Sequence, residues 1–239
     1  MDSFFGRAAG LAAIAAACAA CGGTVKGNDV NLDDSNWAMG ERGELEQQCA
    51  ADDAEACFML GLMLHEGEGL PANPILARTY FQKACDGGEA GGCFILGAMW
   101  ADGDGGPEDI VKSRALFKKA CDLGDPTGCY LLGMMWFEGH GGQQSKEAAK
   151  ALFENACSSG EPRSCYALGN MHRDGDGADE DHAVAREFYR QACEGNDADS
   201  CFQLGAMYEK GEGGDADLET AALLILRACD LGMKAACGE

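Results

Sequence analysis

The stretch KACDGGEAGGCFILG, from Lys83 to Gly97, decides the fold, because its pattern returns along the chain. It places Cys85 and Cys93 on either side of an acidic, glycine-rich segment and then continues into an apolar run. Related segments begin at Lys119, Asn155, Gln191 and Arg227. The chain is therefore an array of similar units.

Cysteine spacing defines the unit. Apart from Cys18 and Cys21, the cysteines form C-x7-C pairs that recur every 36 residues, as from Cys49 to Cys85. The pairs are 49 and 57, 85 and 93, 121 and 129, 157 and 165, 193 and 201, 229 and 237. A fixed period of this length is typical of stacked helical hairpins, in which each unit buries its apolar face against its neighbours.

The sequence pattern of each unit predicts two helices. The first, which we name the A helix, begins about four residues after the first cysteine of a pair and carries columns of aromatic, Leu, Gly and Met residues. A mid-helix glycine costs about 1 kcal/mol relative to alanine, so these glycines are expected to allow close approach of a neighbouring backbone. A G-x-G turn leads to the second, or B, helix, which ends at Ala-Cys and a Gly or Asn typical of a left-handed C-cap. The methionine column is interpreted as core rather than as a metal or haem site.

The paired cysteines lie across the turn between one B helix and the next A helix. In an oxidising compartment we expect a disulfide in each pair, between Cys49 and Cys57, Cys85 and Cys93, Cys121 and Cys129, Cys157 and Cys165, Cys193 and Cys201, and Cys229 and Cys237. A zinc site is the alternative, but C-x2-C pairs are absent and the four histidines share no position in the repeat. We therefore expect no metal site and no cofactor.

The N-terminal segment predicts export. Residues 1–21 contain one Arg and a short apolar run before Cys21, which resembles a bacterial lipoprotein signal with Cys21 as the lipidated residue. Lipidation at Cys18 and simple cleavage of the signal are the alternatives. Residues 22–40 are polar and aperiodic and predict a flexible tether, and residues 41–239 predict the repeat array. We expect a periplasmic or outer-membrane lipoprotein, or a secreted protein.

The net charge of −22 constrains the partners. It disfavours nucleic acids and anionic membrane surfaces, so contact with a membrane is expected only through the N-terminal lipid. A basic protein or peptide segment would be attracted instead. The acidic loops DGDGGPED, from Asp102, and DGDGADED, from Asp174, lack the EF-hand glycine and final acid, so solvated loops are favoured over calcium sites.

The repeat consensus C-F-x-L-G-x-M-[Y/W]-x-x-G-x-G, followed by A-[R/K]-x-[Y/L]-[F/Y]-x-K-A-C-D-x-G, resembles the Sel-1-like repeat family. Within that family it is similar to the disulfide-rich secreted branch, the Helicobacter cysteine-rich proteins, which are related to tetratricopeptide repeats. The resemblance covers about residues 41–239. It implies an all-α, right-handed α/α solenoid with one disulfide per repeat, and a role in binding other proteins.

The same branch includes proteins described as weak penicillin-binding proteins or β-lactamases, so a hydrolase is the alternative function. The sequence contains no S-x-x-K, S-D-N, K-T-G, G-x-S-x-G or H-E-x-x-H motif. We therefore assign no catalytic residue and expect a scaffold, monomeric, with a protein or peptide ligand.

One helix-A stripe is the candidate binding surface. It comprises the residues two, five and nine positions after the second cysteine of each pair, which share one helical face. In the first three units the stripe consists of Met59, Leu62 and Glu66; Ile95, Ala98 and Asp102; and Leu131, Met134 and Glu138. It becomes polar in the last two units, which predicts an apolar groove with an acidic edge for a partner that has basic flanks. The alternative is that Met59, Ile95 and Leu131 are additional core.

Overall fold

The computed structural model describes residues 34–67 and 71–238. This part of the chain consists of eleven α-helices and one short 3-10 helix, with no strand. The helices are α2 (Asp34–Ala50), α3 (Ala54–Glu66), α4 (Pro74–Asp86), α5 (Ala90–Asp102), α6 (Ile110–Asp122), α7 (Pro126–Glu138), α8 (Lys146–Ser158), α9 (Pro162–Asp174), α10 (His182–Glu194), α11 (Ala198–Lys210), α12 (Leu218–Asp230) and η2 (Lys234–Cys237).

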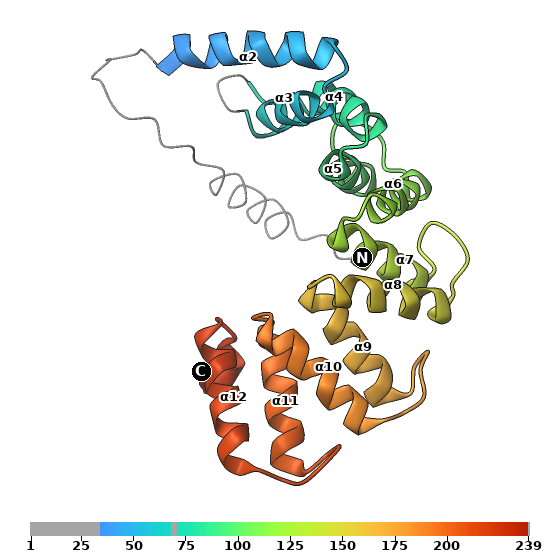
Figure 1. Ribbon diagram of the computed structural model, residues 1–239, viewed down its shortest axis with the longest axis vertical. Helices are drawn as coiled ribbons and strands as arrows, with labels where there is room; N and C mark the ends of the chain where they lie inside the picture. The colour runs from blue at the N-terminus through green and yellow to red at the C-terminus, as the bar shows by residue number, and fades with distance from the viewer. Residues whose placement is uncertain (1–33, 68–70, 239) are drawn as a thin grey trace.

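The helices form a curved array (Figure 1). The A helices are α3, α5, α7, α9 and α11, and the B helices are α4, α6, α8, α10 and α12. Each A helix packs against the B helix that follows it and against the helix that precedes it. Figure 1 shows α5 on the inner side of the curve and α6 on its outer side. The predicted all-α solenoid is confirmed.

The N-terminal predictions are only partly covered. Residues 1–33 lie outside the described residues, so the export signal, Cys18, Cys21 and lipidation stay predictions. Helix α2 begins at Asp34, so residues 34–40 of the predicted tether are helical. The sequence of these residues lacks the periodic apolar face from which helices are predicted, so it did not indicate a helix.

Local signals fix where the helices begin and end. Before α7, Asp125 accepts a hydrogen bond from the backbone N–H of Thr127, and Pro126 occupies the first helical position. Each of the remaining A helices also begins after an Asp or Glu cap. Asp52 and Asn196 each adopt a φ of 66°, where the other equivalent turns have glycine. These caps confirm the turn chemistry predicted from the sequence.

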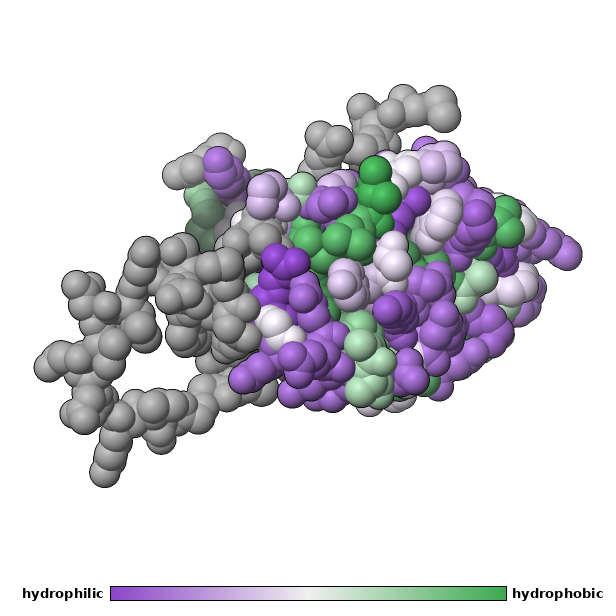
Figure 2. All heavy atoms as spheres, turned by 90° about the horizontal axis from the view of Figure 1, so that it is seen from above, coloured by the Kyte–Doolittle hydropathy of each residue, from purple (hydrophilic) through white to green (hydrophobic). Residues whose placement is uncertain are grey.

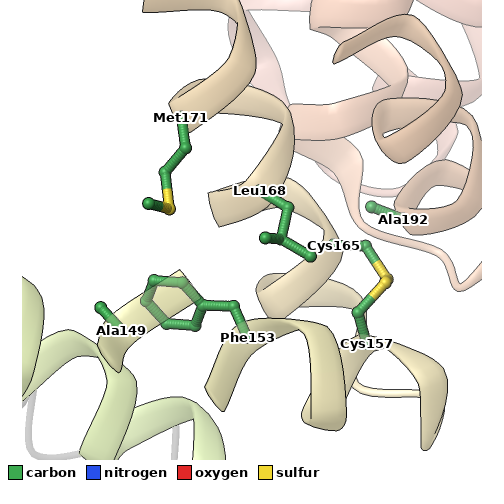
Figure 3. Close-up of a cluster of buried hydrophobic side chains, with 7 residues drawn as sticks. All are labelled: Ala149, Phe153, Cys157, Cys165, Leu168, Met171 and Ala192. Carbon is green, nitrogen blue, oxygen red and sulfur yellow. A yellow bond between two sulfur atoms is a disulfide. The ribbon is translucent and has the colours of Figure 1, made fainter. Parts of the chain in front are cut away.

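Each of the six predicted cysteine pairs forms a disulfide. Their Cα–Cα distances lie between 4.5 and 5.0 Å. Figure 3 shows one of them, Cys157–Cys165, beside Leu168 and Ala192 in a buried cluster. The four central disulfides join a B helix to the next A helix, whereas Cys49–Cys57 joins α2 to α3 and Cys229–Cys237 joins α12 to η2, where Cys237 is exposed. In the chain-entropy model each disulfide contributes about 2 to 3 kcal/mol.

Glycine recurs at one position of the A helices for a packing reason. The ring of Phe153, from the B helix of the same repeat, lies directly against Gly133, where an added Cβ would be 2.6 Å from Phe153 Cε1. Gly61 and Gly169 face Phe81 and Tyr189 in the same way. These rings are 0 to 1% exposed. The glycine thus lets an aromatic ring, rather than a neighbouring backbone, approach the A helix.

Candidate partner-binding surface

The stripe lies on successive A helices, but its members differ in burial. Met59, Leu62, Leu131 and Met134 are half-buried, so part of each side chain is accessible. Ile95 is 2% exposed and belongs to a core cluster with Phe81. The expectation that Ile95 is available for binding is therefore wrong, because neighbouring helices enclose it, and the core alternative holds at this position.

The acidic edge of the stripe is accessible. Glu66, Asp102 and Glu138 occupy the last residue of α3, α5 and α7 and are exposed. Glu138 Oε2 lies 3.1 Å from His140 Nδ1. Partial burial raises the pKa of Glu138, while His140 opposes that rise. This edge presents carboxylates beside half-buried apolar side chains, a combination that suits an amphipathic segment with basic residues.

In the fourth repeat the apolar residues of the stripe are replaced by polar residues that form hydrogen bonds within the protein. Asn170 Oδ1 accepts a hydrogen bond of 2.6 Å from the hydroxyl of Tyr189. Arg173 binds Asp174 with two nitrogens and contacts Gln203 of the next A helix at 3.4 Å. Asn170 and Arg173 thus form hydrogen bonds within the protein, and the apolar stripe is confined to the first three repeats.

One face of the molecule is mostly polar. Figure 2 shows a face that is largely hydrophilic, with hydrophobic residues gathered in a smaller area near its centre. Because folded proteins leave single apolar residues exposed everywhere, only a grouped set carries functional meaning.

The acidic loops have structural roles. Asp109 caps α6 by accepting a hydrogen bond from the backbone N–H of Lys112, and Asp181 caps α10. Asp104 Oδ2 lies 2.9 Å from His65 Nε2 in the preceding repeat. Within residues 34–67 and 71–238, no group of three or more His, Cys, Asp or Glu side chains could hold a metal ion.

Arginine side chains at one position of the B helices contact the next repeat. These contacts were not predicted from the sequence. The guanidinium of Arg114 lies 3.9 Å from the ring centroid of Trp136 in the next repeat and donates to the carbonyls of His140 and Gln143. The signal was present in the sequence, since an Arg or Lys column and a Trp or Tyr column both recur with the period. Equivalent pairs are Arg78 with Trp100 at 4.2 Å and Arg186 with Tyr208 at 3.5 Å.

Comparison with known families explains the period. Five consecutive windows match the Sel1 repeat, at residues 54–89, 90–125, 126–161, 162–197 and 198–233. The chain belongs to the Sel1 repeat family. Sel1-repeat proteins generally mediate protein–protein interactions, and the family is generally non-enzymatic. No curated protein matches the sequence of this Sel1-repeat chain.

Solved structures agree with this fold. A protective antigen of uropathogenic Escherichia coli with an SLR fold is 27% identical, with a TM-score of 0.80 over 88% of this chain. The match spans 44% of the antigen's own length. A Sel1 repeat protein of Oxalobacter formigenes is 22% identical, with a TM-score of 0.75 over 86% of both chains. Cysteine-rich protein B of Helicobacter pylori is 28% identical, with a TM-score of 0.45 over 54% of this chain and 96% of its own.

The disulfides indicate the compartment of this Sel1-repeat chain. Six disulfides are typical of an extracellular or periplasmic protein, because cytosolic thiols are kept reduced. In the part of the chain that the structure describes, no helix combines the length and the apolar composition required to span a bilayer.

Proposed function

We propose that the protein is an exported scaffold that binds a protein or peptide partner through the stripe of its first three repeats. The observation that carries this proposal is the change along one helical face from Leu62 and Met134, apolar and half-buried, to Asn170, which is hydrogen-bonded. A shared face that loses its apolar character while the core columns keep theirs is best explained by an external contact in the first three repeats.

The proposed partner is an amphipathic segment with basic flanks. Its apolar side chains would contact Leu62, Ala98 and Met134, and its cations would approach Glu66, Asp102 and Glu138. The net charge of −22 would increase the rate of encounter with such a segment and make it sensitive to salt. Lipidation of Cys21, which would hold the scaffold at a membrane, is part of the proposal.

Variants with lysine in the stripe test this function. Leu62→Lys with Met134→Lys should abolish capture of the partner from the native cell, while the melting temperature stays near that of the wild type. Thr79→Lys with Ala115→Lys, at exposed positions of two B helices, adds the same number of charges away from the stripe and should leave capture unchanged. A large loss of thermal stability in the double variant would show that the stripe is core, and unchanged capture would refute the proposal.

The hydrolase alternative gains no support from the matched family or from the solved structures. A chromogenic cephalosporin assay on purified protein tests it directly. Robust turnover that persists after further purification would favour the alternative over the scaffold.

A further inference from the structure

Consecutive repeats meet at junctions where a B helix contacts the A–B loop of the next repeat. At three junctions an arginine of the B helix fills the space beneath that loop, as Arg114 does beneath Gly142. A Cβ added to the loop glycine would lie 2.7 Å from an arginine nitrogen at Gly106 and closer still at Gly142 and Gly214. Glycine is therefore required wherever the arginine is present.

The junction between α8 and the loop after α9 departs from this pattern at three positions. Lys150 replaces the arginine, Ala178 replaces the glycine, and His172 replaces the Trp or Tyr. Lys150 Nζ pairs with Glu154 of its own helix at 3.7 Å, and His172 stacks on Phe188. The joint change shows that this junction has no internal guanidinium.

An open hollow occurs at this junction. It is shallow and broadly open to solvent, and its lining comes from α8 and from the loop at residues 177–179. Three of the lining side chains are carboxylates, Glu147, Glu154 and Asp179, and one is the ammonium of Lys150. The lining therefore has a formal charge of −2, from three negative groups and one positive group.

The acids in α8 are peculiar to this junction. The positions equivalent to Glu147 and Glu154 hold Ile75 and Gln82 in α4, and Ala183 and Arg190 in α10. The hollow thus combines extra carboxylates with the place where three other junctions bind a guanidinium group.

We propose that this hollow binds an arginine side chain supplied by a partner protein. The methyl group of Ala178 takes the innermost space, so the incoming guanidinium would lie further out, between the carboxylates of Glu147, Glu154 and Asp179. A planar guanidinium can donate to two carboxylates at once, whereas an ammonium lacks this fork. Free arginine is disfavoured because its own carboxylate would approach the same acidic walls. The site is separate from the stripe and does not depend on the proposed function.

The test uses the blocked tripeptide acetyl-Ala-Arg-Ala-amide and NMR titration of the isotope-labelled, disulfide-bonded protein. We expect shifts confined to residues 147–154 and 177–179, with a dissociation constant of about 1 mM. The lysine tripeptide should bind at least about threefold more weakly, because it lacks the planar donor fork. Free arginine should also bind more weakly, and equal or tighter binding of free arginine would overturn the assignment to a peptide side chain.

Two variants make the assignment falsifiable. Lys150→Arg with Ala178→Gly recreates the internal arginine and should reduce tripeptide binding at least about fivefold. If that variant does not fold, Glu147→Gln with Glu154→Gln should give the same loss, while the charge-matched control Glu209→Gln with Asp230→Asn should not. Undiminished binding to either folded hollow variant, or equal binding of the arginine and lysine tripeptides, would overturn the proposal. The stripe variant Leu62→Lys with Met134→Lys should bind the tripeptide normally, so the two proposals can fail separately.

Discussion

Replacing Gly133 with alanine should destabilise the protein, although alanine is the better helix former. Alanine gains about 1 kcal/mol in helix propensity. The added methyl carbon, however, would lie 2.6 Å from Phe153 Cε1 and 2.8 Å from Cδ1. Phe153 is 1% exposed and packs in a filled cluster, so its ring has little room to move. Overpacking of a core costs about 1 to 3 kcal/mol, and contacts this short fall at the upper end of that range.

The net expectation for Gly133→Ala is a loss of about 1 to 2 kcal/mol in the free energy of unfolding, from the propensity gain set against the overpacking cost. Gly43→Ala is the matched control, because Gly43 lies in α2 with nothing within 4 Å of an added Cβ. It should stabilise the protein by up to about 1 kcal/mol. Circular dichroism during denaturant unfolding, with the disulfides intact, measures both. If Gly133→Ala is as stable as the wild type or more stable, the packing explanation of the glycine column is wrong.

Three further predictions concern the junctions, the disulfides and pH. Arg114→Ala should lower stability by about 1 to 3 kcal/mol, since it removes a cation–π contact and two hydrogen bonds to loop carbonyls; an unchanged unfolding midpoint would contradict this role. Cys121→Ser with Cys129→Ser should cost about 2 to 3 kcal/mol, and non-reducing peptide mapping of the wild type should find bridges within each C-x7-C pair, so free thiols or links between repeats would count against the assignment. Burial alone would raise the pKa of Glu161, but hydrogen bonds from Arg163 and Thr127 outweigh it and hold that pKa below its ordinary value. Its contribution is therefore present above the ordinary pKa of about 4.3 and is lost as the pH falls through the lower folded-state value. Glu161→Gln should therefore reduce the decrease in melting temperature that occurs as the pH is lowered. An equal decrease for the variant and the wild type would refute the assignment.

Burial of Asp125 acts in the opposite direction. Desolvation raises the pKa of its carboxyl group, despite the hydrogen bonds it accepts from Thr127 and Gly128. A carboxyl group whose pKa is raised in the folded state favours the protonated form. Asp125 therefore offsets part of the stability that is lost at acidic pH through Glu161.

The repeat fold could be predicted from the sequence because its signals are local and repeated. The cysteine spacing, the caps such as Asp125-Pro126 and the left-handed position of Asn196 each depend on a few neighbouring residues. At Gly133 the prediction that a neighbouring backbone approaches was wrong, because the ring of Phe153 approaches instead, and the sequence does not say which group does so.

The site was harder to predict because it depends on contacts between repeats. Ile95 and Met59 occupy equivalent positions, yet only Ile95 is fully enclosed, and that difference depends on the neighbouring helices. The arginine column was visible as a pattern, but its partners, such as Trp136 for Arg114, lie in the next repeat. Only the structure shows that Lys150 and Ala178 belong to one junction and leave a hollow there.

Site-specific photo-crosslinking in the native cell tests the central claim of a partner-binding stripe most directly. A photoreactive residue at position 62 or 134 should crosslink to the same partner protein, and one at the exposed B-helix positions Thr79 or Ala115 should not. Absence of a shared crosslinked partner at positions 62 and 134, or equal crosslinking from the B-helix positions, would contradict the account.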